Sequence, residues 1–140
     1  MGSIEISFSR AVQSSITEGK IYLGEVSLTK ADRISKRSEF SYLSHFGKKL
    51  QDRYFIVLFC PGQTEGARLG VTVSRKVGNA VKRNRIKRLS REYFRLNRQE
   101  LAGNWDINII AKKDAADLTL DQVFLSLKGI FQKIRRRNGH

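Results

Sequence analysis

Apolar residues recur at helical spacing in two long stretches of the chain. After Asn79 they return every three or four residues, which at ~100° per residue places them on one stripe of a helix. That stripe consists of Ile86, Leu89, Tyr93 and Leu96. A second stripe, expected to pack on a sheet, starts after Leu118 and consists of Leu120, Val123, Phe124, Leu127, Ile130, Phe131 and Ile134. Asn79 can cap the first helix, and Thr119 with Gln122 resembles a capping box for the second.

A shorter helix is expected at about residues 35–45, with Phe40 and Leu43 on one side. Gly47 suits its C-terminal end, and Thr29 and Asp32 are possible caps before it. From the residues alone, plain core packing is the interpretation of Phe40.

Three further runs predict strands. Residues 53–60 are almost continuously apolar, which is typical of a strand buried on both faces, or covered by a helix on one face and by a ligand on the other. Pro61 and Gly62 end the run. Residues 68–74 alternate, with Leu69, Val71 and Val73 toward the core and a small, polar, open face opposite. Gly70, in the middle of that strand, favours close approach by a backbone or a base. We expect these two strands to form a hairpin. Residues 105–111 form the third strand, with Trp105, Ile107 and Ile109 in phase and Ile110 out of it.

These elements predict an α+β fold, in which a small mixed β-sheet packs with about three helices. The order of elements predicts a strand–helix–strand (βαβ) crossover that encloses the helix after Asn79. With 140 residues the chain is long enough for one domain with a substantial core. We expect residues 1–27 to form a loosely ordered N-terminal extension, which could add a strand or a short helix. Residues 28–137 would form the folded domain and residues 138–140 a flexible tail.

Charge changes this picture, because the formal net charge is +14. Residues 68–98 hold eleven Lys and Arg residues against one acid, Glu92. On the helix after Asn79, the side chains opposite the apolar stripe are Asn84, Lys87, Arg88, Arg91 and Arg95. A solvated helix face usually mixes the two signs of charge to form i,i+4 pairs. The excess of cations therefore favours a face that binds a polyanion, most simply a nucleic acid.

The residues exclude several other classes of function. No apolar run approaches the ~20 residues of a membrane span, and the N-terminus lacks the layout of a signal peptide, so the cytoplasm is the expected location. Cys60 is the one cysteine, which excludes an intramolecular disulfide, and we expect it to be buried. Histidine occurs twice, at positions 45 and 140, and the acids are dispersed. Asp114, Asp117 and Asp121 come closest to a cluster, but their spacing fits helix capping. The residues thus predict an RNA-binding protein without an autonomous catalytic site.

One segment resembles a known family. The sequence SRKVGNAVKRNRIKRLSRE, residues 74–92, is similar to the Arg-Asn-Arg motif of the bacterial ribonuclease P protein subunit, through Gly78 to Val81, Arg83 to Arg85, Lys87, Arg88, Arg91 and Glu92. The resemblance extends from about Leu28 to Ile134. It implies a left-handed crossover and a ribonucleoprotein endonuclease whose RNA subunit removes the 5′ leader of precursor tRNA with Mg²⁺, leaving mature tRNA.

The resemblance also implies two sets of binding residues. Those that would dock on the catalytic RNA are Lys82, Arg83, Asn84, Arg85, Lys87, Arg88 and Arg91. Those that would contact the precursor-tRNA leader are Phe40, Arg68, Ser74, Arg75 and Lys76. The family usually has a second aromatic residue four positions after the first, and Ser44 stands there in this chain. Neither a metal site on the protein nor a protein partner is implied.

Three alternatives remain from the residues. A ribosomal or other structural RNA-binding protein would explain the charge but not the long motif. A double-stranded DNA reader could use the basic helix, although no dimerisation element is visible. An autonomous nuclease would need carboxylate or histidine clusters that the sequence does not contain.

Overall fold

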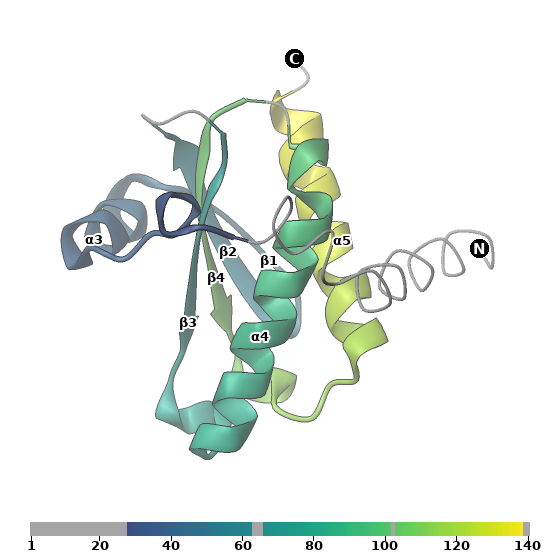
Figure 1. The fold of residues 1–140 in the computed structure, drawn as a ribbon. Helices are drawn as coiled ribbons and strands as arrows, with labels where there is room; N and C mark the ends of the chain where they lie inside the picture. Colours follow the sequence, from purple (N-terminus) through teal and green to yellow (C-terminus); the bar gives the residue numbers. More distant parts are fainter. Residues whose placement is uncertain (1–27, 63–65, 102, 139–140) are drawn as a thin grey trace.

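The computed structural model describes residues 28–62, 66–101 and 103–138 as one sheet with helices on both faces. Helix α3 (Arg37–Phe46) lies on one face of the sheet, and α4 (Ala80–Asn97) and α5 (Leu120–Asn138) lie on the other (Figure 1). The expected extension at residues 1–27 and the end of the expected tail, residues 139–140, lie outside the described residues. None of the helices in the described ranges is long and apolar enough to cross a lipid bilayer.

The sheet contains four strands in the order β1-β2-β4-β3: β1 (Lys48–Gln51), β2 (Phe55–Pro61), β4 (Trp105–Ala111) and β3 (Arg68–Val73). β2 runs antiparallel to β1 and to β4, whereas β3 runs parallel to β4. The β3–α4–β4 segment is therefore the predicted crossover, and the α+β class is confirmed. One short 3₁₀ turn, Lys30–Asp32, precedes α3, and others lie between later elements at Arg75–Val77, Arg98–Glu100 and Lys113–Ala115.

The predicted hairpin of β2 and β3 is wrong, because β4 lies between them. Both faces of β4 carry apolar residues: Ile107 and Ile109 enter the main core, and Ile110 packs on the opposite face. A strand of this kind is buried best in the middle of a sheet. The sequence analysis also missed β1, whose Lys48 and Lys49 are exposed and show no apolar alternation.

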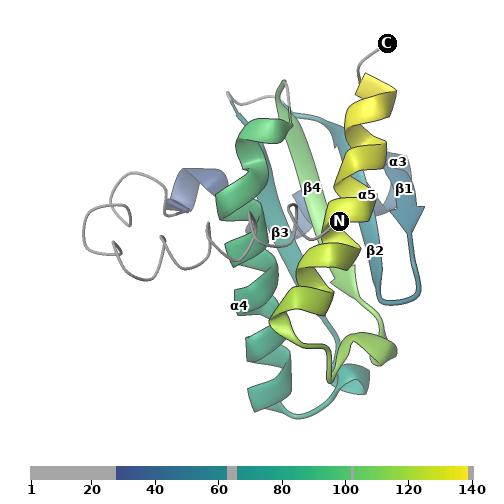
Figure 2. The ribbon, with the colours of Figure 1, turned by 90° about the vertical axis from the view of Figure 1, so that its right-hand side faces the viewer.

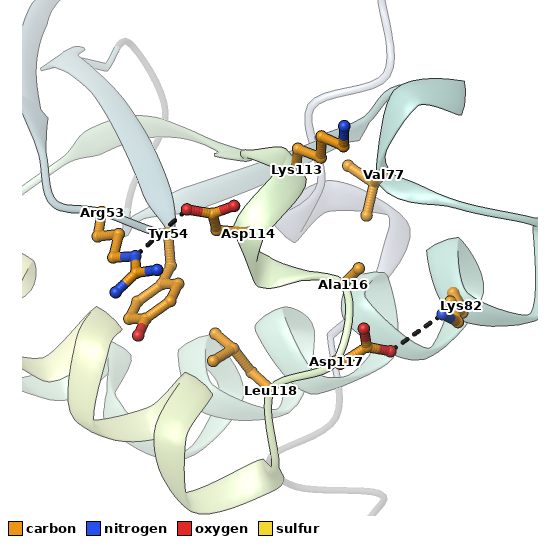
Figure 3. Close-up of a pocket in the computed structure, with 9 residues that line it drawn as sticks. All are labelled: Arg53, Tyr54, Val77, Lys82, Lys113, Asp114, Ala116, Asp117 and Leu118. Atoms are coloured by element: carbon orange, nitrogen blue, oxygen red, sulfur yellow. Dashed lines mark hydrogen bonds and ion pairs between the residues drawn. The ribbon is translucent and has the colours of Figure 1, made fainter.

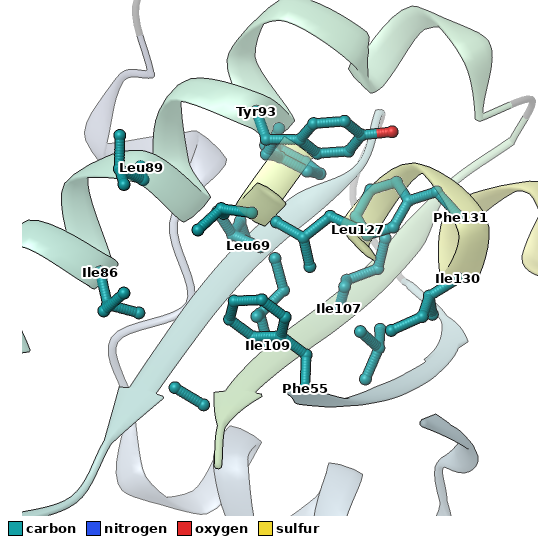
Figure 4. Close-up of a cluster of buried hydrophobic side chains, with 14 of the residues drawn as sticks. Phe55, Leu69, Ile86, Leu89, Tyr93, Ile107, Ile109, Leu127, Ile130 and Phe131 are labelled. Carbon is teal, nitrogen blue, oxygen red and sulfur yellow. The ribbon is translucent and has the colours of Figure 1, made fainter. Parts of the chain in front are cut away.

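The main core lies between the sheet and the pair α4–α5, which run side by side over one face (Figure 2). The predicted stripes of both helices point into it, together with Phe55 of β2 and Leu69 of β3 (Figure 4). The Tyr93 ring meets Phe124 and Phe131 edge-on, with centroid distances of 5.3 and 5.2 Å. Edge-on aromatic contacts of this kind add to the free energy gained by burying the rings, and they stabilise the packing of α4 against α5.

A smaller apolar cluster covers part of the second face of the sheet. It contains Ile34, Leu43 of α3, Leu58 and Cys60, with Phe40 packed against it. Cys60 is 8% exposed, which confirms the predicted burial, and this burial raises the pKa of its thiol. α3 covers this face only in part, so the rest of the face stays open.

The caps explain where the helices begin. The Asn79 carboxamide oxygen accepts the Lys82 N–H at 3.0 Å, as predicted. Thr119 and Gln122 exchange side-chain to backbone hydrogen bonds of 2.9 and 3.2 Å, which confirms the capping box. β2 begins later than predicted, at Phe55, because Asp52 Oδ1 accepts the N–H groups of Tyr54 and Phe55 and holds a turn there.

Candidate nucleic-acid interface

The solvent side of α4 forms a basic face, which we define as Arg83, Asn84, Lys87, Arg88 and Arg91. Asn84, Arg88 and Arg91 are exposed, and Arg83 and Lys87 stand half-buried at its edges. The opposite side of the helix is anchored by Ile86, Leu89 and Tyr93 in the main core, as the apolar spacing predicts. The core therefore fixes the direction in which the cations point.

Repulsion is built into this face. Burial lowers the pKa of the Arg91 guanidinium, and the nearby cation of Arg33 lowers it further. Arg33 lies outside the motif, in the segment before α3, and adds its charge to the same side of the molecule. Arg83 Nε is buried without a hydrogen-bond partner in the described part of the chain. An anionic partner would relieve the repulsion between Arg91 and Arg33.

Two other cations of the motif have partners within the protein. The Arg85 guanidinium donates to the Leu118 carbonyl oxygen at 2.7 Å, which ties α4 to the residues before α5. Lys82 Nζ lies 3.0 Å from a carboxylate oxygen of Asp117, in a pair whose side chains are 46% and 81% exposed. Such an exposed pair is weak and is readily exchanged for a phosphate.

Arg95 does not join the basic face, contrary to the helical spacing. Its side chain is 8% exposed, and its guanidinium is bound by the carboxylate of Glu92 one turn earlier. Arg95 and Glu92 therefore neutralise each other, and the exposed positive charge of α4 comes from the other Lys and Arg residues of the helix.

A cleft of about 510 Å³ opens between α3 and the uncovered part of the sheet. Its lining residues come from α3, β2, β3, α4 and β4: Phe40, Ser44, Leu58, Val71, Thr72, Val73, Lys87, Asn108 and Ile110. Lys87 lies at the edge of the basic face and also lines the cleft, so the two surfaces are continuous.

The half-buried ring of Phe40 packs on the smaller cluster, as the residues predict, and also lines the cleft. A Cβ atom on Gly70 would lie 2.5 Å from Phe40 Cε1. The close approach expected at Gly70 is therefore made by this ring, whereas we had expected a backbone or a base. Ser44, which stands where the family usually has an aromatic residue, also lines the cleft and leaves it wider there.

Arg68 differs from the other residues expected to contact the leader. Its guanidinium binds Asp106 through two hydrogen bonds of 2.9 and 2.8 Å and Glu39 of α3 at 2.7 Å. These contacts raise its pKa, the hydrogen bond to Asp106 most strongly. Its charge is thus neutralised within the protein. Ser74, Arg75 and Lys76 are exposed in the turn between β3 and α4.

Two polar residues lie on the open part of the sheet: Thr72, on the small polar face that the alternation in β3 predicts, and Asn108, which the sequence analysis missed. Thr72 Oγ1 donates to Asn108 Oδ1 at 3.2 Å, and Asn108 is only 4% exposed yet lines the cleft. Asn108 shares its phase in β4 with Asp106 and Ile110. A lone amide in that phase was the available signal for a polar group on the second face.

A second hollow, of about 480 Å³, lies beside the N-terminal end of α4 (Figure 3). Arg53 pairs with Asp114 at 3.2 Å on one side of it, and Lys82 pairs with Asp117 on the other. Asp114 lies in the first turn of the Lys113–Ala115 3₁₀ helix and Asp121 in the first turn of α5, which fits the helix-terminus role expected for them. Asp114 and Asp117 also form the two ion pairs beside this hollow. Within the described ranges, no three acidic, histidine or cysteine side chains gather as a metal site would require.

Comparisons with known proteins agree with this geometry. The family model described as Ribonuclease P matches residues 28–135. A ribonuclease P protein component from Desulforapulum autotrophicum is 49% identical over 117 residues, covering 84% of this chain and 100% of the relative. One from Desulfatibacillum aliphaticivorans is 46% identical over 118 residues, covering 84% of this chain and 100% of that relative.

Solved structures agree as well. The RNase P protein of Staphylococcus aureus superimposes with a TM-score of 0.71 at 36% identity, covering 76% of this chain and 97% of that one. The RNase P protein of Thermotoga maritima gives 0.67 at 33% identity, covering 72% of this chain and 96% of that one.

Proposed function

The chain belongs to the ribonuclease P protein family, and from this membership we propose how its surfaces divide the work of the ribonucleoprotein. The chain is the protein subunit of an endoribonuclease that matures the 5′ ends of tRNA, and the catalysis is carried out by the RNA subunit. Its partners are that RNA and precursor tRNA. What remains to be assigned is which residues meet which RNA.

The basic face docks on the catalytic RNA. The observation that carries this assignment is the exposure of Asn84, Arg88 and Arg91 on a helix whose other side is fixed in the core. Lys82 joins them when a phosphate displaces Asp117, and Arg83 and Lys87 flank them. Arg85 contributes through the fold, because its hydrogen bond to the Leu118 carbonyl sets the position of the helix. Phosphate neutralisation supplies the affinity.

The cleft holds the single-stranded leader of precursor tRNA. Phe40 supplies a ring for stacking, which is worth ~1–3 kcal/mol per base without choice of sequence. Ser74, Arg75 and Lys76 meet the leader backbone at the rim, whereas Arg68 holds α3 against the sheet through Glu39 and Asp106. Lys87, common to the cleft and the basic face, lies where the two RNA molecules meet.

Chemistry then depends on Mg²⁺ held by the RNA, and the protein's positive charge lowers the Mg²⁺ concentration that this RNA needs. Residues 28–137 act as the RNA-binding domain, and the cytoplasm, where tRNA is processed, is the proposed location.

The test is precursor-tRNA cleavage at low Mg²⁺ by the catalytic RNA alone, the protein alone, and both together. We expect cleavage only with both present. Arg88→Ala with Arg91→Ala should weaken binding of the catalytic RNA, whereas Phe40→Ala should weaken precursor tRNA more than mature tRNA. No stimulation by the protein would refute the subunit role, and equal losses for precursor and mature tRNA would refute the leader assignment.

A further inference from the structure

The outward side of α3 carries two large aromatic side chains with no cover. Tyr42 is 56% exposed and Phe46 is 72% exposed. The two rings are one helical turn apart, and their centroids lie 5.0 Å from each other at an interplanar angle of 39°. The His45 ring lies 6.3 Å from the Phe46 ring and is fixed by a hydrogen bond of 2.8 Å from Nδ1 to the Ser41 carbonyl oxygen. Adjacent exposed rings of this kind mark a binding surface.

This aromatic pair is separate from the cleft. Phe40, Leu43 and Ser44 point from α3 toward the sheet, where they join the smaller cluster or line the cleft. At ~100° per residue, Tyr42 and Phe46 project from the other side of the same helix. α3 thus carries aromatic rings on both of its sides. An RNA strand that leaves the cleft and passes over α3 would reach Tyr42 and Phe46 directly.

The charge around the pair is positive. Lys36 and Arg37 are exposed where α3 begins, and Lys48 and Lys49 are exposed on β1 directly after it ends. Glu39 is the one acidic residue in α3 and β1, and its carboxylate is held by Arg68 at 2.7 Å. A second copy of this chain docked here would therefore bring like charges together, whereas a polyanion would be attracted.

We propose that Tyr42 and Phe46 form a second stacking platform for single-stranded RNA, which binds leader nucleotides farther from the cleavage site than those held in the cleft. The proposal rests on the assignment of the cleft to the leader. Bases stack on the two rings without sequence preference, and Lys49, which shares the α3 face of the sheet with its register partner Leu58, binds a backbone phosphate. The platform extends the leader contact around α3 and makes affinity depend on leader length.

The test uses the holoenzyme and a series of precursors whose leaders are shortened one nucleotide at a time. The double variant Tyr42→Ala, Phe46→Ala should bind long-leader precursors about 5- to 10-fold more weakly, the size of one base–ring stacking interaction. Short-leader precursors, mature tRNA and the catalytic RNA should bind as they do to the unaltered protein. Losses independent of leader length, or no loss, would overturn the proposal.

Three further variants distinguish this surface from the cleft and from a general loss of exposed apolar side chains. Phe40→Ala should weaken short and long leaders alike, so failure of the cleft assignment appears as an unchanged affinity in that variant. Leu125→Ala removes another apolar side chain, 51% exposed and located on α5, and should change neither series. Phe46→Leu keeps an apolar residue without the stacking surface and should reproduce much of the loss. Full affinity in Phe46→Leu would overturn the proposal. So would a double variant whose mass in solution without RNA is lower than that of the unaltered protein, because both results would favour a protein partner at this surface.

Discussion

The guanidinium of Arg68 meets the carboxylate of Asp106 side by side, with Nε 2.9 Å from Oδ1 and Nη2 2.8 Å from Oδ2. The two residues are register partners on the parallel strands β3 and β4, and the same guanidinium binds Glu39 of α3. One half-buried cation thus joins the crossover to the helix that forms the wall of the cleft.

Replacing Arg68 by Lys should destabilise the protein by about 2 kcal/mol, because lysine cannot make the paired hydrogen bonds and leaves a carboxylate poorly matched. Urea unfolding would measure the change. The control is Arg53→Lys, since the Arg53–Asp114 pair is 74% and 55% exposed and its loss should cost less than about 0.5 kcal/mol. Equal costs for the two variants would contradict the structural role of Arg68.

Gly70→Ala should displace the Phe40 ring, because the new methyl group would lie 2.5 Å from Phe40 Cε1. We expect a loss of about 1–3 kcal/mol in stability and weaker binding of precursor tRNA, with unchanged affinity for the catalytic RNA. In a Phe40→Ala background the same substitution should cost much less, since the ring is gone. Additive effects of the two substitutions, measured by unfolding and by binding, would show that the ring does not rest on Gly70.

Replacing Arg88 and Arg91 by alanine should weaken binding of the catalytic RNA by about tenfold for each cation. The slope of log affinity against log salt should become shallower by about 0.7–0.9 for each phosphate that the protein no longer neutralises. Stability should not fall, because removing Arg91 relieves its repulsion with Arg33. Lys133→Ala, an exposed cation on α5, is the control and should leave the slope unchanged.

Arg85→Ala should behave differently from these two variants. It removes the hydrogen bond to the Leu118 carbonyl, so we expect a loss of about 1 kcal/mol in stability together with weaker RNA binding. Thermal or urea unfolding without RNA separates the two effects. An unchanged stability would mean that Arg85 acts only through the RNA.

Asp32 should make stability depend on pH in the acid range. Burial acts to raise the pKa of its carboxyl, but hydrogen bonds from Thr29 and the cation of Arg98, 3.0 Å away, hold that pKa below its ordinary value. A depressed pKa stabilises the fold above the unfolded value of about 3.9, and this contribution disappears as the pH falls through the folded value.

Asp32→Asn should therefore cost about 0.5–1 kcal/mol at neutral pH, and the difference from the unaltered protein should vanish once the pH falls below the pKa of this carboxyl in the folded protein. Urea unfolding at a series of pH values measures both. Asp117→Asn is the matched control, since that side chain is 81% exposed and should matter little at any pH. A difference for Asp32→Asn that persists at acid pH would rule out the charge as its origin.

Local sequence patterns predicted much of the fold and the basic face of α4. The bounds of β4 at residues 105–111, the Asn79 cap and the capping box at Thr119 all agree with the structure, because each depends on neighbours within a few residues. The core stripe of α4 agrees for the same reason. A helical period fixes which side is buried and hence where Arg88 and Arg91 point.

Interactions between distant residues decided the rest. The order of the strands depends on which strand has two apolar faces to bury, and the residues of the turn after Pro61 do not indicate this. The neighbour of β3 is therefore β4, whereas the turn predicted β2. The neutralisation of Arg68, the seat of Phe40 on Gly70 and the burial of Asn108 in the cleft each join segments about 30 or more positions apart in the sequence. The sequence by itself determined that the helix after Asn79 has a basic face, because charge and helical period are local properties. Only the tertiary structure decided which cations on that helix are paired within the protein, because the fold brings their partners together.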